Sequence, residues 1–364
     1  MIPVYRPSIS AKEIQYVDEA MASTWISSKG AFLDRFEHDF SDYIGADYGV
    51  AAANGTVALH LAFATLGMGP GAEVIVPTLT YIASVNAITY TGATPVFVDS
   101  DPDHWNLDPE LVERAITPRT KAIEVVHLYG YPADMDPILE IARRHGLAVV
   151  EDAAEAHGAE YKGRKVGSIG SIGVFSFFGN KIVTTGEGGM LLTSDLLLAD
   201  RARHLRGQGV SPTKTYWHDM VGFNYRMTNI AAAIGCAQLE RINETLDAKR
   251  HLARLYQTHL ADVDGVTIQI DPPWARPVYW MNCILVAPQQ RDPLMAFLLS
   301  EGIETRPFFY PAHTLPMYTT TQQFPVAERL GASGINLPSY PALEDDEVER
   351  ICAHIRDFMR SRGV

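Results

Sequence analysis

Cysteines and long apolar runs are scarce in this sequence. Only three of the 364 residues are cysteine, at positions 236, 283 and 352, and none forms a CxxC pair. A scattered, odd set of this kind indicates buried thiols in a reducing compartment rather than disulfides or a metal site. No run approaches the roughly 18 apolar residues of a membrane span, and residues 1–16 lack the apolar core of a signal peptide. The sequence therefore predicts a cytoplasmic protein that does not enter a membrane.

Basic residues are also in the minority. Lysine and arginine number 30 against 43 acidic residues, which gives a net charge of -13. This balance argues against a nucleic-acid partner but leaves room for a local phosphate pocket. The 12 histidines include no HxxxH or HExxH pair, so no metal site is expected. With 47% hydrophobic residues the chain can bury a large core, and its length predicts two domains.

Short apolar runs alternate with helical patterns over much of the chain. Strands are predicted at 48–52, 73–76, 94–98, 122–126, 148–151, 173–177 and 189–193, and helices at 56–66, 81–91, 109–116 and 135–145. This alternation predicts an α/β sheet with helices on both faces. Later, a long helix at 239–260, a strand at 278–286 and helices at 293–300 and 344–360 predict a smaller α+β domain. We therefore expect a large domain over 1–240 and a small C-terminal domain over 241–364.

Three places beside predicted strands carry residues suited to catalysis. Gly55 and Thr56 lie where a strand gives way to a helix, so backbone N–H groups and a hydroxyl can bind an anion there; an ordinary helix cap is the alternative. Asp152 ends an apolar strand, where ligands gather in open α/β sheets, although a helix-capping acid also fits. Lys181 follows two phenylalanines and precedes a glycine-rich turn. If this lysine is buried, desolvation lowers its pKa toward that of a nucleophilic amine; a solvated loop lysine is the alternative.

Together these places are more specific than any one of them alone. An anion cradle, a carboxylate that can keep a pyridine nitrogen protonated, and a lysine that can form a Schiff base are what pyridoxal 5′-phosphate (PLP) needs from a protein. With this order the chain closely resembles the sugar aminotransferases of the DegT/DnrJ/EryC1/StrS family, nearly from end to end. The resemblance is carried by residues 25–30 (WISSKG), 77–81 (PTLTY), 126–130 (VHLYG), 176–190 (SFFGNKIVTTGEGGM), 222–227 (GFNYRM), 306–311 (RPFFYP) and 336–339 (NLPS).

The resemblance implies a fold-type-I PLP aminotransferase, with a mostly parallel mixed sheet flanked by helices and a smaller C-terminal α+β domain. It implies that Lys181 binds PLP covalently and that Asp152 pairs with the pyridinium nitrogen. The other implied cofactor contacts are Glu155 at the ring hydroxyl, Tyr81 stacked on the ring, the phosphate ligands Gly55, Thr56 and Ser176, and Asn224. Because Asn224 matches an asparagine that reaches the cofactor of the neighbouring subunit, a homodimer with active sites at the interface is expected.

The implied substrate contacts are less specific. They are Ser27, Lys29, Arg306, Tyr310 and His313, and a structural role is an equally good interpretation of Arg306 and His313. The cluster of Arg201, Arg203 and Arg206 is interpreted as a solvated helix face rather than a diphosphate site.

The resemblance also implies a reaction. The amino group of L-glutamate moves to the C4 ketone of a nucleotide-linked 4-keto-6-deoxysugar. The run before Lys181 is similar to that of enzymes which make GDP-perosamine, a precursor for lipopolysaccharide O-antigen, from GDP-4-keto-6-deoxy-D-mannose. Because related 3-dehydratases carry histidine in place of this lysine, transamination rather than deoxygenation is expected. A dTDP- or UDP-linked ketosugar and amination at C3 stay open, as does a non-catalytic PLP-fold sensor. A nicotinamide enzyme is disfavoured, because residues 67–71 (GMGPG) lack the GxGxxG spacing and follow a helix.

Overall fold

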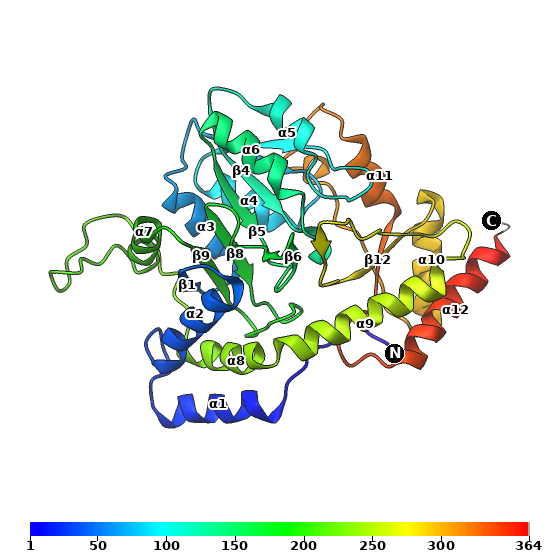
Figure 1. Ribbon diagram of the computed structural model, residues 1–364, viewed down its shortest axis with the longest axis horizontal. Coiled ribbons are helices and arrows are strands. Elements are labelled where there is room, and N and C mark those ends of the chain that lie inside the picture. Colours follow the sequence, from blue (N-terminus) through cyan, green and yellow to red (C-terminus); the bar gives the residue numbers. More distant parts are fainter. Residues whose placement is uncertain (363–364) are drawn as a thin grey trace.

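The computed structural model describes residues 1–362 and contains one large sheet, two smaller sheets and surrounding helices (Figure 1). The α-helices are α1 (Ala11–Ala22), α2 (Ala31–Ile44), α3 (Gly55–Thr65), α4 (Ile82–Tyr90), α5 (Pro109–Ala115), α6 (Met135–His145), α7 (Leu196–Arg206), α8 (Asn229–Glu240), α9 (Ile242–Leu260), α10 (Pro288–Ser300), α11 (Pro325–Ser333) and α12 (Asp345–Ser361). The strands are β1 (Tyr48–Ala52), β2 (Glu73–Pro77), β3 (Thr94–Val98), β4 (Thr120–Val126), β5 (Ala148–Asp152), β6 (Glu160–Tyr161), β7 (Arg164–Lys165), β8 (Ile172–Ser176), β9 (Gly189–Thr193), β10 (Thr267–Ile268), β11 (Ala275–Arg276), β12 (Asn282–Leu285), β13 (Arg306–Pro307) and β14 (Gly334–Leu337).

The large sheet has seven strands in the order β1-β9-β8-β5-β4-β2-β3. Neighbours from β8 to β3 pair in parallel, whereas β9 runs antiparallel to both β8 and β1. Every residue of β2, β8 and β9 is buried, as expected where helices cover both faces of a largely parallel sheet. The predicted α/β class and the mostly parallel mixed sheet are therefore confirmed.

The strand order places the ends of several strands side by side at one edge of the sheet, and this edge is the candidate site. Strands β2, β4, β5 and β8 end at this edge, and β1 does as well because it is reversed twice relative to β8 through β9. Ligands of open α/β sheets bind outside the carboxyl ends of the strands. The predicted residues 55, 81 and 181 lie just after β1, β2 and β8, and residue 152 is the last residue of β5.

The second part of the chain forms a four-stranded antiparallel sheet in the order β10-β12-β14-β13. A separate hydrophobic cluster lies here, with Leu252 and Leu260 of α9 and Ile351 and Ile355 of α12 among its buried members. Helix α9 runs diagonally from α8 to α12 (Figure 1). The single long helix predicted at 239–260 is wrong at its start, because Arg241 separates α8 from α9. The division of the chain at residue 240 stays a prediction.

Glu124 of β4 is the least satisfied polar side chain of the large sheet. It is completely buried, and neither carboxyl oxygen has a hydrogen-bond partner. Burial, with a smaller contribution from nearby Asp152, raises its pKa well above the usual value. A buried carboxyl without partners costs about 1–3 kcal/mol, so the wild-type fold tolerates Glu124 at the expense of stability.

We therefore expect Glu124→Leu to raise the free energy of unfolding by about 1–3 kcal/mol. The folded wild-type protein holds a proton on Glu124 that the unfolded chain releases above pH 4.5, its ordinary pKa. Wild-type stability from this group therefore falls as the pH rises through that value. Urea unfolding should show a larger gain for Glu124→Leu at pH 8 than at pH 5.

A matched control for this prediction is Glu151→Leu in the neighbouring strand. Glu151 is equally buried, but it accepts hydrogen bonds from His127 and from the backbone N–H groups of Gly167, Ile169 and Gly170. Its removal should destabilise the protein. A loss of stability in Glu124→Leu, or an equal gain at both pH values, would contradict the account of Glu124.

Candidate active site

A cavity of about 620 Å³ opens at the carboxyl edge of the large sheet. The first part of the chain lines it with residues from the loops after β1, β2, β5 and β8, and the second part adds residues near Trp280, Arg306 and Asn336. Of the residues predicted from the sequence, the cavity brings together Gly55, Thr56, Tyr81, Asp152, Glu155, Ser176, Lys181 and Arg306.

Lys181 lies in the wall of this cavity with only 12% of its side chain exposed. Its Nζ is 3.7 Å from Glu155 Oε1 and 3.9 Å from the centre of the Trp280 ring. Burial lowers the pKa of Lys181, while the carboxylates of Glu155 and Asp152 oppose that shift. A lowered pKa increases the fraction of neutral amine, which is the nucleophilic form.

Asp152 is the last residue of β5 and is held from two sides. Its Oδ2 accepts a hydrogen bond of 2.8 Å from the Ser84 hydroxyl, and its Oδ1 accepts one of 3.1 Å from the backbone N–H of Ala154. Burial raises its pKa, and these hydrogen bonds and the Lys181 ammonium oppose the shift. The carboxylate is therefore fixed in direction, and because burial disfavours its negative charge, a cationic partner such as a protonated ring nitrogen would stabilise it.

Glu155 lines the cavity beside Lys181, with its Oε1 3.7 Å from the lysine Nζ. Its Oε2 accepts a hydrogen bond of 2.7 Å from the backbone N–H of Tyr129. Burial raises the pKa of Glu155 to about 7, and the Lys181 ammonium opposes the shift. Tyr129 is itself buried, and its backbone lies in the left-handed region, with φ 55°. Non-glycine residues adopt this conformation only when the surroundings enforce it. The N–H that fixes Glu155 is thus part of a strained turn.

The start of α3 forms an anion cradle beside these groups. Asn54 is the N-cap, and its side chain accepts the backbone N–H of Val57 at 3.0 Å. The N–H groups of Gly55 and Thr56 precede it in the first turn, where no acceptor exists within the helix. A Cβ on Gly55 would lie 2.6 Å from the Ser176 Cβ, so only glycine lets the start of α3 approach the end of β8 this closely. The helix cap and the anion cradle are therefore compatible.

Other predicted site residues lie elsewhere in the chain. His313 is buried, with its Nδ1 2.7 Å from Thr78 Oγ1 and its Nε2 3.2 Å from Glu328 Oε1. Ser27, Lys29 and Asn224 are exposed and are not among the cavity-lining residues, and Tyr310, 59% exposed, is not among them either.

The three clustered arginines do not line the cavity either. Arg203 and Arg206 form ion pairs with Asp200 and Glu37. Arg201 and Arg203 agree with the interpretation as a solvated helix face. For Arg206 that interpretation is wrong, because its side chain is only 15% exposed and also donates a hydrogen bond of 2.7 Å to the Ala51 carbonyl.

Sequence reasoning missed three residues that shape the site. Trp280 covers Lys181, Ser84 orients Asp152, and the Tyr5 hydroxyl donates a hydrogen bond of 2.8 Å to the Lys181 carbonyl. Ser84 lies one turn beyond Tyr81 at the start of α4, so a hydroxyl there was a usable signal. Nothing local to Tyr5 or Trp280 connects them to Lys181.

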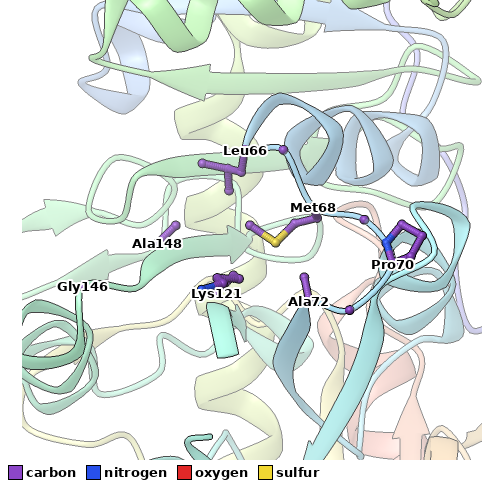
Figure 2. A pocket seen from close by; sticks show the side chains of 10 residues that line it. Leu66, Met68, Pro70, Ala72, Lys121, Gly146 and Ala148 are labelled. Carbon is purple, nitrogen blue, oxygen red and sulfur yellow. The ribbon is translucent and has the colours of Figure 1, made fainter. Parts of the chain in front are cut away.

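A second cavity, of about 600 Å³, lies at the opposite edge of the sheet (Figure 2). The loop from Leu66 to Ala72 and the starts of β4 and β5 line it, and Lys121 is its only charged lining residue. It holds no carboxylate or nucleophile to work with that lysine. Within residues 1–362, moreover, no group of three or more His, Cys, Asp or Glu side chains is arranged to hold a metal ion. The first cavity is therefore the candidate active site.

Comparison with known proteins agrees with this geometry. The model of the DegT/DnrJ/EryC1/StrS aminotransferase family matches residues 7–356. The chain belongs to this family. It is 51% identical to the GDP-perosamine synthase of Escherichia coli O157:H7 over 98% of both chains. It is 41% identical to a dTDP-3-amino-3,4,6-trideoxy-alpha-D-glucose transaminase of Streptomyces venezuelae, over 90% of this chain and 87% of the relative.

Solved structures give the same answer for the fold and the cofactor. A protein of Streptococcus pneumoniae assigned as a sugar aminotransferase, in its PLP form, superposes with a TM-score of 0.94 at 28% identity, covering 99% of each chain. This protein is a PLP-dependent sugar aminotransferase, as the sequence predicted. The residues of the cavity fit PLP, because an amine, a fixed carboxylate and a helix N-terminus line one space.

Proposed function

We propose that this aminotransferase moves the amino group of L-glutamate to the C4 ketone of GDP-4-keto-6-deoxy-D-mannose and forms GDP-perosamine. The observation that carries the proposal is the 51% identity to a GDP-perosamine synthase along nearly the whole of both chains. A dTDP- or UDP-linked ketosugar is the second candidate, favoured by the 41% identity to a dTDP-sugar transaminase. GDP-perosamine would supply the synthesis of lipopolysaccharide O-antigen. The free, buried cysteines support a reducing cytoplasm as the place of synthesis.

We assign the catalytic roles as follows. PLP, when bound, supplies an electron sink for the negative charge that develops when Cα of glutamate loses its proton. Lys181 Nζ holds the cofactor. Once the incoming glutamate has freed this amine from the cofactor, it takes the Cα proton, and in the second half of the reaction it gives a proton to the sugar carbon. Asp152 keeps the ring nitrogen protonated, and Ser84 and Ala154 keep Asp152 in place. The first-turn N–H groups of α3 and the hydroxyls of Thr56 and Ser176 bind the phosphate.

Tyr81 and Arg306 line the mouth of the cavity in positions suited to the ring and to an anionic substrate. Tyr81 is 57% exposed and its ring centre lies 5.5 Å from that of Phe309. Arg306 and Lys181 are the only cations among the lining residues. Because glutamate and a nucleotide sugar are both anions, the Arg306 guanidinium is the natural anchor for them.

The test is incubation with L-glutamate and a panel of GDP-, dTDP- and UDP-4-keto-6-deoxysugars, with products identified by mass. We expect an aminated sugar from the GDP compound in the greatest yield, and none from any compound with Lys181→Ala as the control. Amination of only the dTDP or UDP sugars would replace the GDP assignment with the second candidate. Position-specific NMR of the product separates C4 from C3 amination.

We further propose that two chains form a homodimer with active sites at the interface. The segment between α7 and α8 extends away from the rest of the chain (Figure 1) and exposes Tyr216 at 93%, Val221 at 90% and Trp217 at 52%. Large exposed apolar groups of this kind mark interaction surfaces. Asn224 in this segment is exposed and bonded to Arg226, outside its own cavity, which supports its assignment to the neighbour's phosphate.

Mixing two inactive variants tests the shared site. Lys181→Ala and Asn224→Ala are each expected to be nearly inactive alone. After subunit exchange, half of the dimers are mixed and each has one intact site, so activity should recover to about a quarter of the wild-type value. Ultracentrifugation verifies the dimer. A monomer, or verified mixed dimers without recovered activity, would contradict the proposal.

A further inference from the structure

Lys249 of α9 is a buried cation that the proposed chemistry does not use. It is 1% exposed, and its Nζ donates hydrogen bonds to the carbonyl oxygens of Trp280, at 2.7 Å, and Ser339. No carboxylate lies within ion-pair distance of it in residues 1–362. Burial lowers its pKa to about 7, so the fold bears a cost whenever this amino group is protonated. A buried charge held by two carbonyls calls for a reason.

The first of these carbonyls leads directly to the catalytic loop. Trp280, whose carbonyl oxygen accepts from Lys249, donates its indole N–H to the Asn180 carbonyl at 2.7 Å. The same indole ring lies 3.9 Å from Lys181 Nζ. A single residue therefore connects Lys249 to both the backbone and the amine of the lysine segment.

The second carbonyl leads to the same loop from the opposite direction. Ser339, which accepts from Lys249, donates its backbone N–H to the Val4 carbonyl at 3.0 Å. The next residue, Tyr5, donates its hydroxyl to the Lys181 carbonyl at 2.8 Å. The Tyr5 ring centre also lies 6.0 Å from Lys249 Nζ, within reach of a cation–π attraction.

These contacts form a closed circuit through five segments that are distant in the sequence. We propose that Lys249 is a positioning residue for Lys181: its ammonium closes a ring of hydrogen bonds in which Trp280 and Tyr5 hold the carbonyls of Asn180 and Lys181. This inference rests on the proposed role of Lys181. Displacement of a reacting group by about 1 Å can cost on the order of 100-fold in rate, so fixing the backbone on both sides of Lys181 has catalytic value.

The test compares Lys249→Met with the wild-type protein in two ways. Hydrogen exchange of the peptide 178–184 is followed in the cofactor-free protein. In the holoenzyme we follow kcat and the pKa at which the visible absorbance of bound PLP changes with pH. We expect exchange to rise about tenfold, the absorbance pKa to move, and kcat to fall about tenfold with KM for both substrates nearly unchanged. Arg250→Met is the matched control, because Arg250 is the next residue of α9 and, among residues 1–362, its side chain bonds only to the Pro277 carbonyl, at 3.3 Å.

A second variant keeps the test decisive. Tyr5→Phe removes one bond of the ring and should move the same three quantities in the same directions, and the double variant should show no more than the larger single effect. If Lys249→Met does not fold, Tyr5→Phe alone must show the changes. Unchanged exchange and unchanged absorbance pKa in a folded variant, or fully additive effects, would overturn the proposal. Because exchange is read without cofactor, that result is independent of whether Lys181 performs the chemistry.

Discussion

Lys181→Ala is expected to abolish turnover and the absorbance band that belongs to the covalent bond between the lysine and the cofactor. The amine is the only nucleophile in the cavity that lies beside both Asp152 and Glu155, and its lowered pKa suits proton transfer. Losing a positioned general base costs roughly 100- to 10,000-fold, and losing the covalent link adds to this. We therefore expect kcat to fall by at least about 10,000-fold.

Lys162→Ala is the matched control for this variant. Lys162 is exposed and paired with Asp136 away from the cavity, so its removal should leave kcat and the absorbance unchanged. Measurable steady-state transamination by Lys181→Ala, within about 100-fold of the wild-type rate, would contradict the assigned role.

Asp152→Asn is expected to keep the cofactor bound while reducing kcat by about 1,000-fold. The amide fills the same space and can still meet Ser84, but it carries no charge to hold a ring nitrogen protonated. The loss should appear in kcat rather than in KM, because the interaction grows as charge develops during the reaction. Stopped-flow measurement of the half-reaction with glutamate isolates this step from the reaction with the sugar.

Glu124→Gln is the control that separates this effect from general damage to buried carboxyls. Glu124 lies on the strand next to Asp152, is also buried, and interacts with Asp152 without lining the cavity. Its kcat should stay within about twofold of wild type. Near-normal kcat in Asp152→Asn would contradict the pairing with the ring nitrogen.

The sequence predicted the large sheet well, because its strands are nearly continuous apolar runs. β1, β3 and β9 begin and end at the predicted residues, and β5 extends one residue further to include Asp152. Helix α1 was missed although Ser10 and Glu13 form a capping box, a signal that the sequence displays. The start of helix α2 was harder to predict, since its N-cap is a glycine with no side-chain hydrogen bond.

The catalytic residues were predictable for a different reason. Gly55 and Lys181 each follow a strand of one sheet and Asp152 ends another, so the common edge brings them together once the topology is known. Trp280 could not be found in this way, because it reaches Asn180 across 100 residues of sequence. Lys249 was hidden within an amphipathic helix, where a lysine normally indicates a solvated face.

Reduction of the holoenzyme with borohydride, followed by peptide mapping, tests the central claim most directly. Reduction makes the bond between a lysine amine and the cofactor permanent, so the labelled position is identified by mass. We predict one pyridoxyl group per chain, on Lys181. A label on another lysine, or no label on a protein that holds its cofactor, would contradict the account.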